Sequence, residues 1–233
     1  MIIAVDGPAG AGKGTLAKTL ASHFNMAYLD TGALYRAVGV AVLEQNGSPE
    51  DPATATKVAK NLDFDFRDTG GGVFQAFIDG QDAESKLRTA EAGEAASQVS
   101  AIPQVRKALK EFQVAFAQNN REGNGAILDG RDIGTIICPD ADMKFFLEAD
   151  ARVRAERRHK QLQEKGVDIT MDEVYAQTVA RDERDRNRKD APLKPADDAV
   201  IVDTSNLTAE EVFEHIKTLV EDQLPSSSAF QTA

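Results

Sequence analysis

The first fifteen residues constrain the fold of this chain more than any other segment. The apolar run Ile2–Val5 leads directly into Gly7-Pro8-Ala9-Gly10-Ala11-Gly12-Lys13-Gly14-Thr15, and an amphipathic segment follows from Leu16. Strand, glycine-rich loop, lysine and helix in this order are the context of a phosphate-binding P-loop. The glycines let consecutive amide groups curve around an anion, and the helix adds the positive end of its dipole. We therefore predict that residues 7–15 bind the phosphates of a nucleotide.

The loop departs from the usual pattern at one position. The motif places serine or threonine directly after the lysine, whereas Gly14 holds that position here and Thr15 follows one residue later. We expect Lys13 to supply a mobile positive charge to the outer phosphates and Thr15 to take part in binding Mg²⁺. The alternative is a glycine turn that merely opens a helix, and the strand and helix on either side disfavour it.

Composition excludes several classes of protein. The formal net charge of −11 argues against a broad surface for nucleic acid or anionic lipid, because affinity for phosphate backbones comes mainly from lysine and arginine. No apolar stretch reaches the roughly 18 residues that a membrane-spanning helix needs. The single cysteine, Cys138, lies in an apolar run and is expected to pack in the core. A strand that starts at Ile2 leaves no room for a cleaved signal peptide, so we expect a cytoplasmic protein.

Short apolar strands alternate with helical patterns along most of the chain. We predict strands at residues 2–5, 27–29, 126–128, 143–147 and 199–202, and helices at 13–23, 33–44, 90–100, 103–119, 151–164 and 171–188. A capping box at Thr208–Glu211 begins a last helix, and the polar tail 225–233 is expected to fray. This order predicts an α/β fold with an open, parallel, five-stranded sheet, flanking helices and ligands at the carboxyl ends of the strands.

Residues 62–87 follow a different pattern. Leu62, Phe64 and Phe66 alternate with charged residues, which is typical of a half-buried strand. The glycines of 69–72 can turn the chain, residues 73–78 return, and Asp79-Gly80 signals a second turn. We predict a small antiparallel insert between helical segments.

Charged and polar residues gather at the predicted strand ends. Asp129 closes an apolar strand, where a second carboxylate that organises Mg²⁺ belongs in a P-loop enzyme. The alternative is an ordinary turn aspartate before Gly130. At the end of the second strand, Thr31 can cap the next helix, and Tyr35 and Arg36 follow one turn later. Simple packing for Tyr35 and a solvated charge for Arg36 are the alternatives there.

Arginines are concentrated late in the chain. They are Arg152, Arg154, Arg157, Arg158, Arg181, Arg184, Arg186 and Arg188. Arg154, Arg157 and Arg158 share one helix face, and Arg181, Arg184, Asp185 and Arg188 share another. Interleaved acidic residues allow a solvated lattice of ion pairs, which we favour for Arg152 and Arg186. For the others a clamp on a transferring phosphoryl group fits better, because arginine stays charged and binds phosphate through two hydrogen bonds.

The chain carries no strong signature of a general base. Its 3 histidines, His23, His159 and His215, lie outside the motifs. A hydroxyl acceptor usually needs a base, whereas a phosphomonoester is already largely dianionic at neutral pH. Abundant arginine without a base therefore points to a nucleoside monophosphate as the phosphoryl acceptor.

Four motifs together resemble bacterial cytidylate kinases in order and spacing. They are residues 7–15, Asp30–Arg36, Asp129–Thr135 and Arg181–Arg188, and the segments 95–99 and 103–106 also look like that family. The resemblance covers nearly the whole chain and implies a P-loop NTPase-like core, a mobile LID and a CMP-side insert. It implies the phosphorylation of CMP or dCMP by ATP with Mg²⁺, in a single domain. The domain would consist of a CORE (1–60, 90–150 and 190–224), the CMP-side insert (about 61–89) and the LID (about 151–170).

The resemblance also implies a role for each matching residue. Ser97, Arg106 and Asp132 would read the cytosine edge, and Arg36, Arg131 and Arg188 would hold the CMP phosphate. Arg181 and Asp185 would face the sugar, and Thr31 and Tyr35 would line the acceptor pocket. Arg157 and Arg158 would close over the transferring phosphoryl group. We expect a monomer without nucleic-acid or membrane partners, and the loop 204–207 is a candidate for contact with adenine.

Three alternatives to this prediction differ in class. The first is another nucleoside monophosphate kinase, acting on UMP or AMP. The second is a regulatory P-loop switch or a nucleic-acid-stimulated ATPase, which the negative charge disfavours. The third is a nucleotide-binding scaffold without turnover, which the combination of Lys13, Asp129 and the arginines disfavours.

Overall fold

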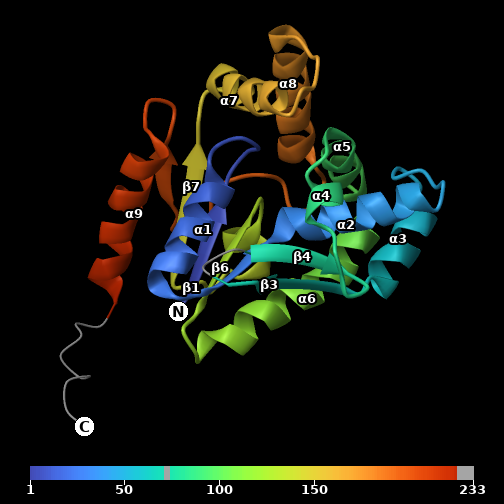
Figure 1. The fold of residues 1–233 in the computed structure, drawn as a ribbon. Helices are drawn as coiled ribbons and strands as arrows, with labels where there is room; N and C mark the ends of the chain where they lie inside the picture. The colour runs from blue at the N-terminus through green and yellow to red at the C-terminus, as the bar shows by residue number, and fades with distance from the viewer. Residues whose placement is uncertain (71–73, 225–233) are drawn as a thin grey trace.

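A parallel five-stranded sheet forms the centre of the computed structural model, which describes residues 1–70 and 74–224 (Figure 1). Its strands are β1 (Ile2–Asp6), β2 (Ala27–Asp30), β6 (Ala126–Gly130), β7 (Met143–Glu148) and β8 (Val200–Asp203), in the spatial order β2-β6-β1-β7-β8. All neighbouring pairs run parallel. The predicted α/β class and the predicted sheet are confirmed.

Helices bury the sheet. β1 and β6 are fully buried along their length, which explains why their sequences are almost continuously apolar rather than alternating. The helices α1 (Lys13–Phe24), α2 (Thr31–Glu44) and α6 (Pro103–Arg121) pack against β6, and α9 (Ala209–Gln223) packs beside α1. α9 begins with the predicted capping box, in which Thr208 and Glu211 exchange hydrogen bonds.

The strand register brings the polar strand ends to one edge. Asp30 of β2 lies opposite Asp129 of β6, and Asp6 of β1 lies opposite Gly130. The P-loop leaves β1 at this same edge and continues into α1. Carboxylates and loop that are far apart in sequence therefore meet at the carboxyl ends of the strands, where α/β sheets bind ligands.

The predicted antiparallel insert is present. Strands β3 (Phe64–Asp68), β4 (Phe74–Ile78) and β5 (Gln81–Asp82) form a separate sheet in the order β3-β4-β5, followed by α4 (Glu84–Leu87). Phe64 and Phe66 point into the core, as their alternation predicted. Residues 71–73 of the predicted turn and returning strand lie outside the described residues. α3 (Pro52–Asn61) precedes the insert and was not predicted.

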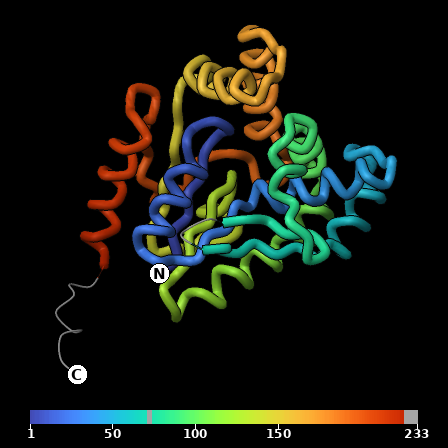
Figure 2. The backbone as a smooth tube through the Cα atoms, viewed as in Figure 1, coloured from blue at the N-terminus to red at the C-terminus, as the bar shows by residue number. Residues whose placement is uncertain are grey.

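Two helices project from the sheet. α7 (Ala151–Glu164) and α8 (Met171–Asn187) pack on each other away from the strands, and α5 (Ala90–Val99) lies near the foot of α8 (Figures 1 and 2). Arg184 of α8 forms an ion pair with Glu94 of α5 at 2.6 Å. This ion pair joins the two-helix projection to α5.

Three further predictions can be compared with the fold. The prediction that Thr31 caps α2 is wrong: Asp30 is the N-cap and accepts from the amide of Ala33, while the Thr31 hydroxyl donates to the carbonyl of Asp129. Cys138 is buried as predicted, and burial raises the pKa of its thiol to about 11. Along residues 1–70 and 74–224, no helix is both long and apolar enough to cross a membrane. The predicted fraying of residues 225–233 falls outside the described residues.

Candidate active site

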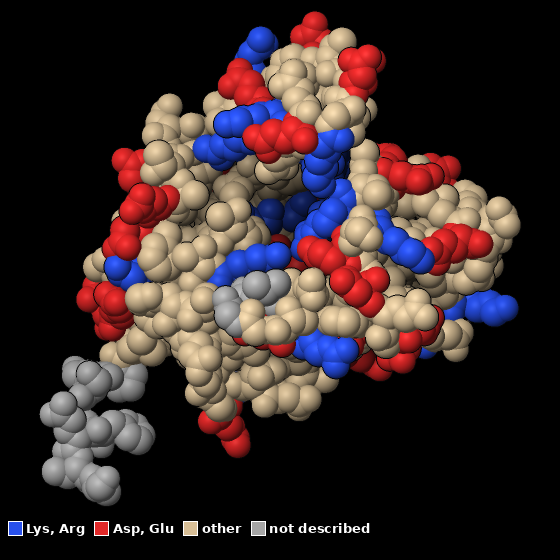
Figure 3. All heavy atoms as spheres, viewed as in Figure 1, with Lys and Arg blue, Asp and Glu red and all other residues tan. Residues whose placement is uncertain are grey.

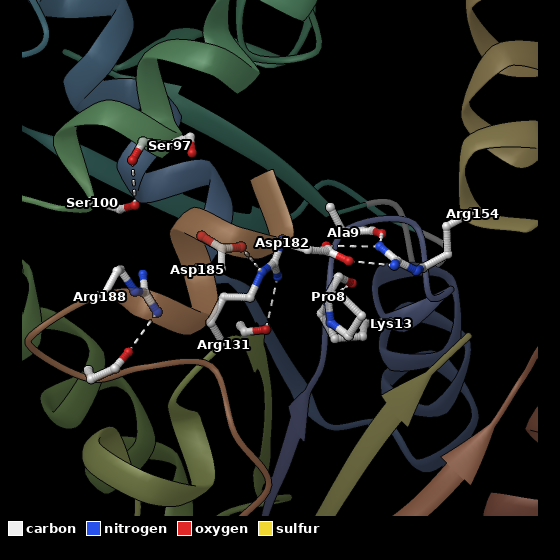
Figure 4. Close-up of polar contacts among 12 residues, drawn as sticks. Pro8, Ala9, Lys13, Ser97, Ser100, Arg131, Arg154, Asp182, Asp185 and Arg188 are labelled. Carbon is white, nitrogen blue, oxygen red and sulfur yellow. Dashed lines mark hydrogen bonds and ion pairs between the residues drawn. The ribbon is translucent and has the colours of Figure 1, made fainter. Parts of the chain in front are cut away.

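The P-loop wraps the start of α1. Gly7 has a φ of 144°, and a side chain there would meet the carbonyl oxygen of Leu147 of β7 at 2.0 Å, so only glycine fits. Lys13 is buried, and its ammonium group donates to the carbonyl of Pro8 at 2.8 Å (Figure 4). The loop therefore holds a lysine and a helix N-terminus next to each other, an arrangement that attracts anions.

Lys13 lies among other charges. Burial lowers the pKa of Lys13 well below its ordinary value, and Arg131 and Arg181 act in the same direction. Asp129 and Asp6 oppose this shift. Several cations close together without a bound anion are electrostatically unfavourable, so the site is prepared for a group that carries more than one negative charge.

Asp129 is held at the end of β6 by two contacts. The hydroxyl of Tyr28 donates to Asp129 Oδ2 at 2.5 Å, and Thr31 Oγ1 donates to the backbone carbonyl at 2.7 Å. Burial, followed by the neighbouring Asp30, raises the pKa of Asp129. A positively charged ligand beside it would favour its ionised form.

Ion pairs and hydrogen bonds order the arginines around Asp132 and Asp185. Arg131 donates to Asp185 at 3.1 Å, and Arg188 donates to the carbonyl of Ala191 at 2.8 Å (Figure 4). Arg106 pairs with Asp132. Burial opposes ionisation of Asp185, but Arg131 and Arg181 hold its pKa below the ordinary value. The Arg106 guanidinium also lies 5.7 Å from the centre of the Tyr35 ring. These contacts fix cations and carboxylates in one buried group.

Several donors in this group have no partner. Among the described residues, four buried atoms of predicted site residues lack a hydrogen bond: Arg36 Nη1, Ser97 Oγ, Arg181 Nε and Arg188 Nε. Arg36 still forms an ion pair with Asp30 at 3.6 Å. Buried polar atoms normally make hydrogen bonds, so the unsatisfied donors of Arg36, Arg181 and Arg188, which all line one cavity, indicate a polar ligand.

Three of the four arginines of α7 share one helix face, and the structure gives Arg154, Arg157 and Arg158 different contacts. Arg154 is buried and binds both carboxylate oxygens of Asp182, at 3.0 and 2.5 Å, and the carbonyl of Ala9 (Figure 4). Arg157 binds the hydroxyl and carbonyl of Thr204. Arg154 therefore joins α7, α8 and the P-loop. Its partner Asp182 could not be identified from sequence spacing.

Arg158 differs from both neighbours on α7. Among the described residues it makes no hydrogen bond or ion pair, and burial and the nearby Arg36 lower its pKa. Two guanidinium groups from opposite sides of the site are thus close enough to repel each other. Arg152 is exposed, as predicted.

One cavity of about 1720 Å³ contains nearly all of the predicted site residues. Figure 3 shows its opening as a hollow with lysine and arginine side chains gathered at its walls, below α7 and α8. The cavity is lined by residues 9–15 of the P-loop and by Thr31, Tyr35, Arg36, Arg106, Asp129, Arg131, Asp132, Arg157, Arg158, Arg181, Asp185 and Arg188. Gly7, Pro8 and Ser97 do not line it, whereas Ser100, at the end of α5, does.

The cavity also includes residues that the sequence did not identify. Arg88 follows α4 and donates to Asp30 at 3.0 Å and to Glu84 at 2.6 Å, while its Nη2 atom is buried without a partner among the described residues. No local motif surrounds Arg88, so only its tertiary position reveals it.

Thr204 and Leu207 of the predicted adenine loop line the cavity as well.

The donor atoms beside the P-loop fit Mg²⁺. Asp129 and Thr15 both line the cavity and offer a carboxylate and a hydroxyl, and Mg²⁺ is usually held by one or two such oxygens together with water and substrate phosphates. Within the described ranges, no group of three or more histidine, cysteine, aspartate or glutamate residues could hold a metal ion. A Mg²⁺ ion held by Asp129 and Thr15 would take its remaining ligands from water and from substrate phosphates.

The family model and the curated relatives both indicate one family. The family model described as cytidylate kinase matches residues 3–222. A cytidylate kinase of Aeromonas salmonicida is 42% identical over 98% of this chain and 97% of the relative. Another from Paramagnetospirillum magneticum is 48% identical over 91% and 93%. An uncharacterized protein from Eubacterium ventriosum has a similar structure, with a TM-score of 0.52 at 14% identity over 96% and 99%, which supports the fold alone.

Proposed function

The chain belongs to the cytidylate kinase family and is an enzyme that phosphorylates CMP with ATP as the phosphoryl donor, and on this basis we propose a role for each site residue. The unpaired buried donors on the acceptor side carry the proposal. Arg36, Arg181 and Arg188 line the cavity, and each buries a donor atom that makes no hydrogen bond to a described residue. A nucleoside monophosphate offers acceptor oxygens for all of them, on its phosphate, its base and its sugar.

On the donor side, we propose that the amides of residues 7–15 and the Lys13 ammonium bind the phosphates of ATP. Arg157 fixes Thr204, and the loop after Thr204 is proposed to contact adenine. Thr15 and Asp129 would hold Mg²⁺, directly or through water. The metal would supply a further positive charge on the transferring phosphates.

On the acceptor side, we propose that Arg36, Arg131 and Arg188 bind the CMP phosphate. The Arg106–Asp132 pair and Ser97 would recognise cytosine, since its edge carries one amino donor beside two acceptors. Arg181 and Asp185 would contact the sugar of CMP or dCMP. Thr31 and Tyr35 would line this pocket.

The reaction we propose is a direct transfer between two nucleotides that are already ionised. A CMP phosphate oxygen attacks the terminal phosphorus of ATP, the bond from that phosphorus to the ADP oxygen breaks, and ADP leaves with the electron pair. Because the attacking phosphate is largely dianionic, no general base is needed. The negative charge that shifts during transfer would be neutralised by Lys13, Arg131, Arg157 and Arg158. Alignment of the two nucleotides would supply most of the remaining acceleration of the reaction.

We further propose the division into CORE, CMP-side insert and LID given above, with α7 moving as part of the LID to exclude water. The Arg154–Asp182 pair supports a coupled movement of α7 and α8, because it ties the two helices together. A monomeric state, the absence of nucleic-acid partners and a cytoplasmic location stay predictions.

A nucleotide panel tests the proposed acceptor. ADP formation from ATP is measured with CMP, dCMP, UMP and AMP, each with and without Mg²⁺, and Lys13→Ala serves as the inactive control. We expect the highest kcat/KM with CMP or dCMP and no appreciable turnover without metal. Preferred turnover of AMP or UMP would contradict the acceptor assignment. ATP hydrolysis that responds to nucleic acid but to no monophosphate would contradict the kinase itself.

A further inference from the structure

We propose that Tyr28 is a positioning residue for Asp129, and that the inserted sheet holds Tyr28 in place for this purpose. The inference rests on the proposed role of Asp129 toward the metal–nucleotide complex. It assigns to β3 and β4 a function on the ATP side of the reaction, in addition to the CMP-side role proposed for the insert.

The first observation is the contact itself. Tyr28 is 1% exposed and lies in the middle of β2, and its hydroxyl donates to Asp129 Oδ2 at 2.5 Å. A hydrogen bond from a neutral donor to a buried carboxylate fixes the carboxylate's rotation and is stronger than a bond between two neutral groups. Because the hydroxyl occupies Oδ2, the other oxygen stays available to the metal or to a water bound to it.

The second observation is how the tyrosine ring is held. Its centre lies 5.5 Å from that of Phe66 on β3 and 5.1 Å from that of Phe74 on β4, in edge-to-face geometry with interplanar angles of 71° and 76°. Phe66 and Phe74 are themselves stacked, with their centres 6.5 Å apart. Such aromatic contacts are favourable and directional, so the two phenylalanines restrict the position of the Tyr28 hydroxyl.

The third observation is the place of Gly14 of the P-loop. A side chain at position 14 would meet Asp129 Oδ2 at 3.5 Å and the Tyr28 hydroxyl at 3.8 Å. The loop therefore packs directly against the Tyr28–Asp129 pair. The position that carries a hydroxyl in the common P-loop pattern is glycine here, and a hydroxyl from β2 lies next to it instead.

A merely structural explanation makes different predictions from ours. Buried tyrosine hydroxyls usually find a partner, and the bond to Asp129 could serve only to satisfy Tyr28. In that case removal of the hydroxyl would change stability alone. If Tyr28 positions Asp129, removal would weaken binding of the metal–nucleotide complex more than binding of the metal-free nucleotide.

The decisive variant is Tyr28→Phe, which keeps the ring and its contacts with Phe66 and Phe74. Isothermal titration with a non-hydrolysable ATP analogue, in Mg²⁺ and separately in EDTA, measures the two affinities. We expect a loss of about tenfold in Mg²⁺ and at most about twofold in EDTA, with CMP affinity unchanged. The matched control is Tyr175→Phe, because Tyr175 is 38% exposed on α8 and does not line the cavity. It should change neither affinity.

Two further variants separate this inference from the proposed role of Asp129. If Asp129→Asn loses Mg²⁺-dependent affinity while Tyr28→Phe does not, the Tyr28 inference is overturned and the Asp129 assignment stands. If neither variant loses it, the proposed role of Asp129 fails as well. If both lose it, the double variant should lose little more than Asp129→Asn alone, and full additivity would overturn the coupling.

Phe74→Leu tests the part assigned to the insert. It keeps the Tyr28 hydroxyl but removes one of the two ring contacts, so we expect a smaller loss of affinity for the nucleotide in Mg²⁺ than in Tyr28→Phe. The measurement remains informative should Tyr28→Phe fold poorly. Unchanged affinity in Mg²⁺ for a folded Phe74→Leu protein would overturn the role of the inserted sheet.

Discussion

Asp6 is the buried carboxylate that connects β1 to the segment carrying two of the predicted CMP contacts. Its oxygens accept from the amides of Ile133 and Gly134, both at 2.8 Å. These amides directly follow Arg131 and Asp132, so Asp6 determines where that segment begins to turn. Burial raises the pKa of Asp6 to about 6, and the nearby Asp132 adds to the shift.

The pKa of Asp6 makes folding stability depend on pH in a defined direction. Between its ordinary value of 3.8 and about 6, the folded protein keeps a proton that the unfolded chain has released. The contribution of Asp6 to the free energy of unfolding is therefore complete below pH 3.8 and is lost as the pH rises through about 6. We expect the free energy of unfolding, relative to Asp6→Asn, to fall by at most about 3 kcal/mol over this range. Urea unfolding of both proteins at several pH values measures it, and a difference that is constant with pH would contradict the assignment.

Sequence motifs predicted which residues of short segments come together in space. Lys13, Asp129, Arg131 and Asp185 line one cavity, as their positions at strand ends and in motifs suggested. Pairing was not predictable, because it depends on tertiary contacts. The same arginine-rich helix face supplies Arg154, which is neutralised by Asp182, and Arg158, which has no such partner among the described residues.

At the level of elements, the sequence predicted strands and long helices but not the short connecting helices. α3 is rich in alanine, threonine and lysine, so its apolar pattern is weak, and its only clear signal is the Asp51 cap before Pro52. The π-helical turn at Ile133–Ile137 has no local signature at all. Its first two amides bind Asp6, a residue that lies more than one hundred positions away.

The start of α8 offers a test of stability that can be separated from catalysis. Thr170 and Glu173 form a reciprocal capping box at the first turn, whereas Arg181 and Asp185 lie toward the opposite end of the helix. We expect Thr170→Ala to lower the free energy of unfolding by about 1 kcal/mol, because the cap satisfies amides that the helix leaves free. Denaturant unfolding gives the loss, and steady-state kinetics should show an unchanged KM for CMP. A large rise in that KM would mean that the whole of α8 depends on its cap.

The whole molecule combines a negative net charge with a positively charged cavity. The chain carries a formal charge of −11, yet Lys13 and several arginines line the cavity. Burial and the nearby Arg131 lower the pKa of Arg181 to about 10, which indicates that the cations destabilise one another when no anion is bound. The acidic exterior limits non-specific binding of polyanions, and the cavity walls attract small phosphorylated ligands.

This repulsion predicts that a divalent anion stabilises the protein through the cavity. About 10 mM sulfate should raise Tm by about 2–4 °C over chloride at equal ionic strength, because an anion that binds only the folded state shifts the unfolding equilibrium. Arg181→Gln removes one of the repelling cations, so its Tm without sulfate should be no lower than that of the parent protein and its gain from sulfate should be smaller. Arg152→Gln is the matched control, since Arg152 is exposed and does not line the cavity. An equal gain in all three proteins, measured by differential scanning calorimetry, would show that sulfate acts through the general surface rather than through the phosphate-binding arginines.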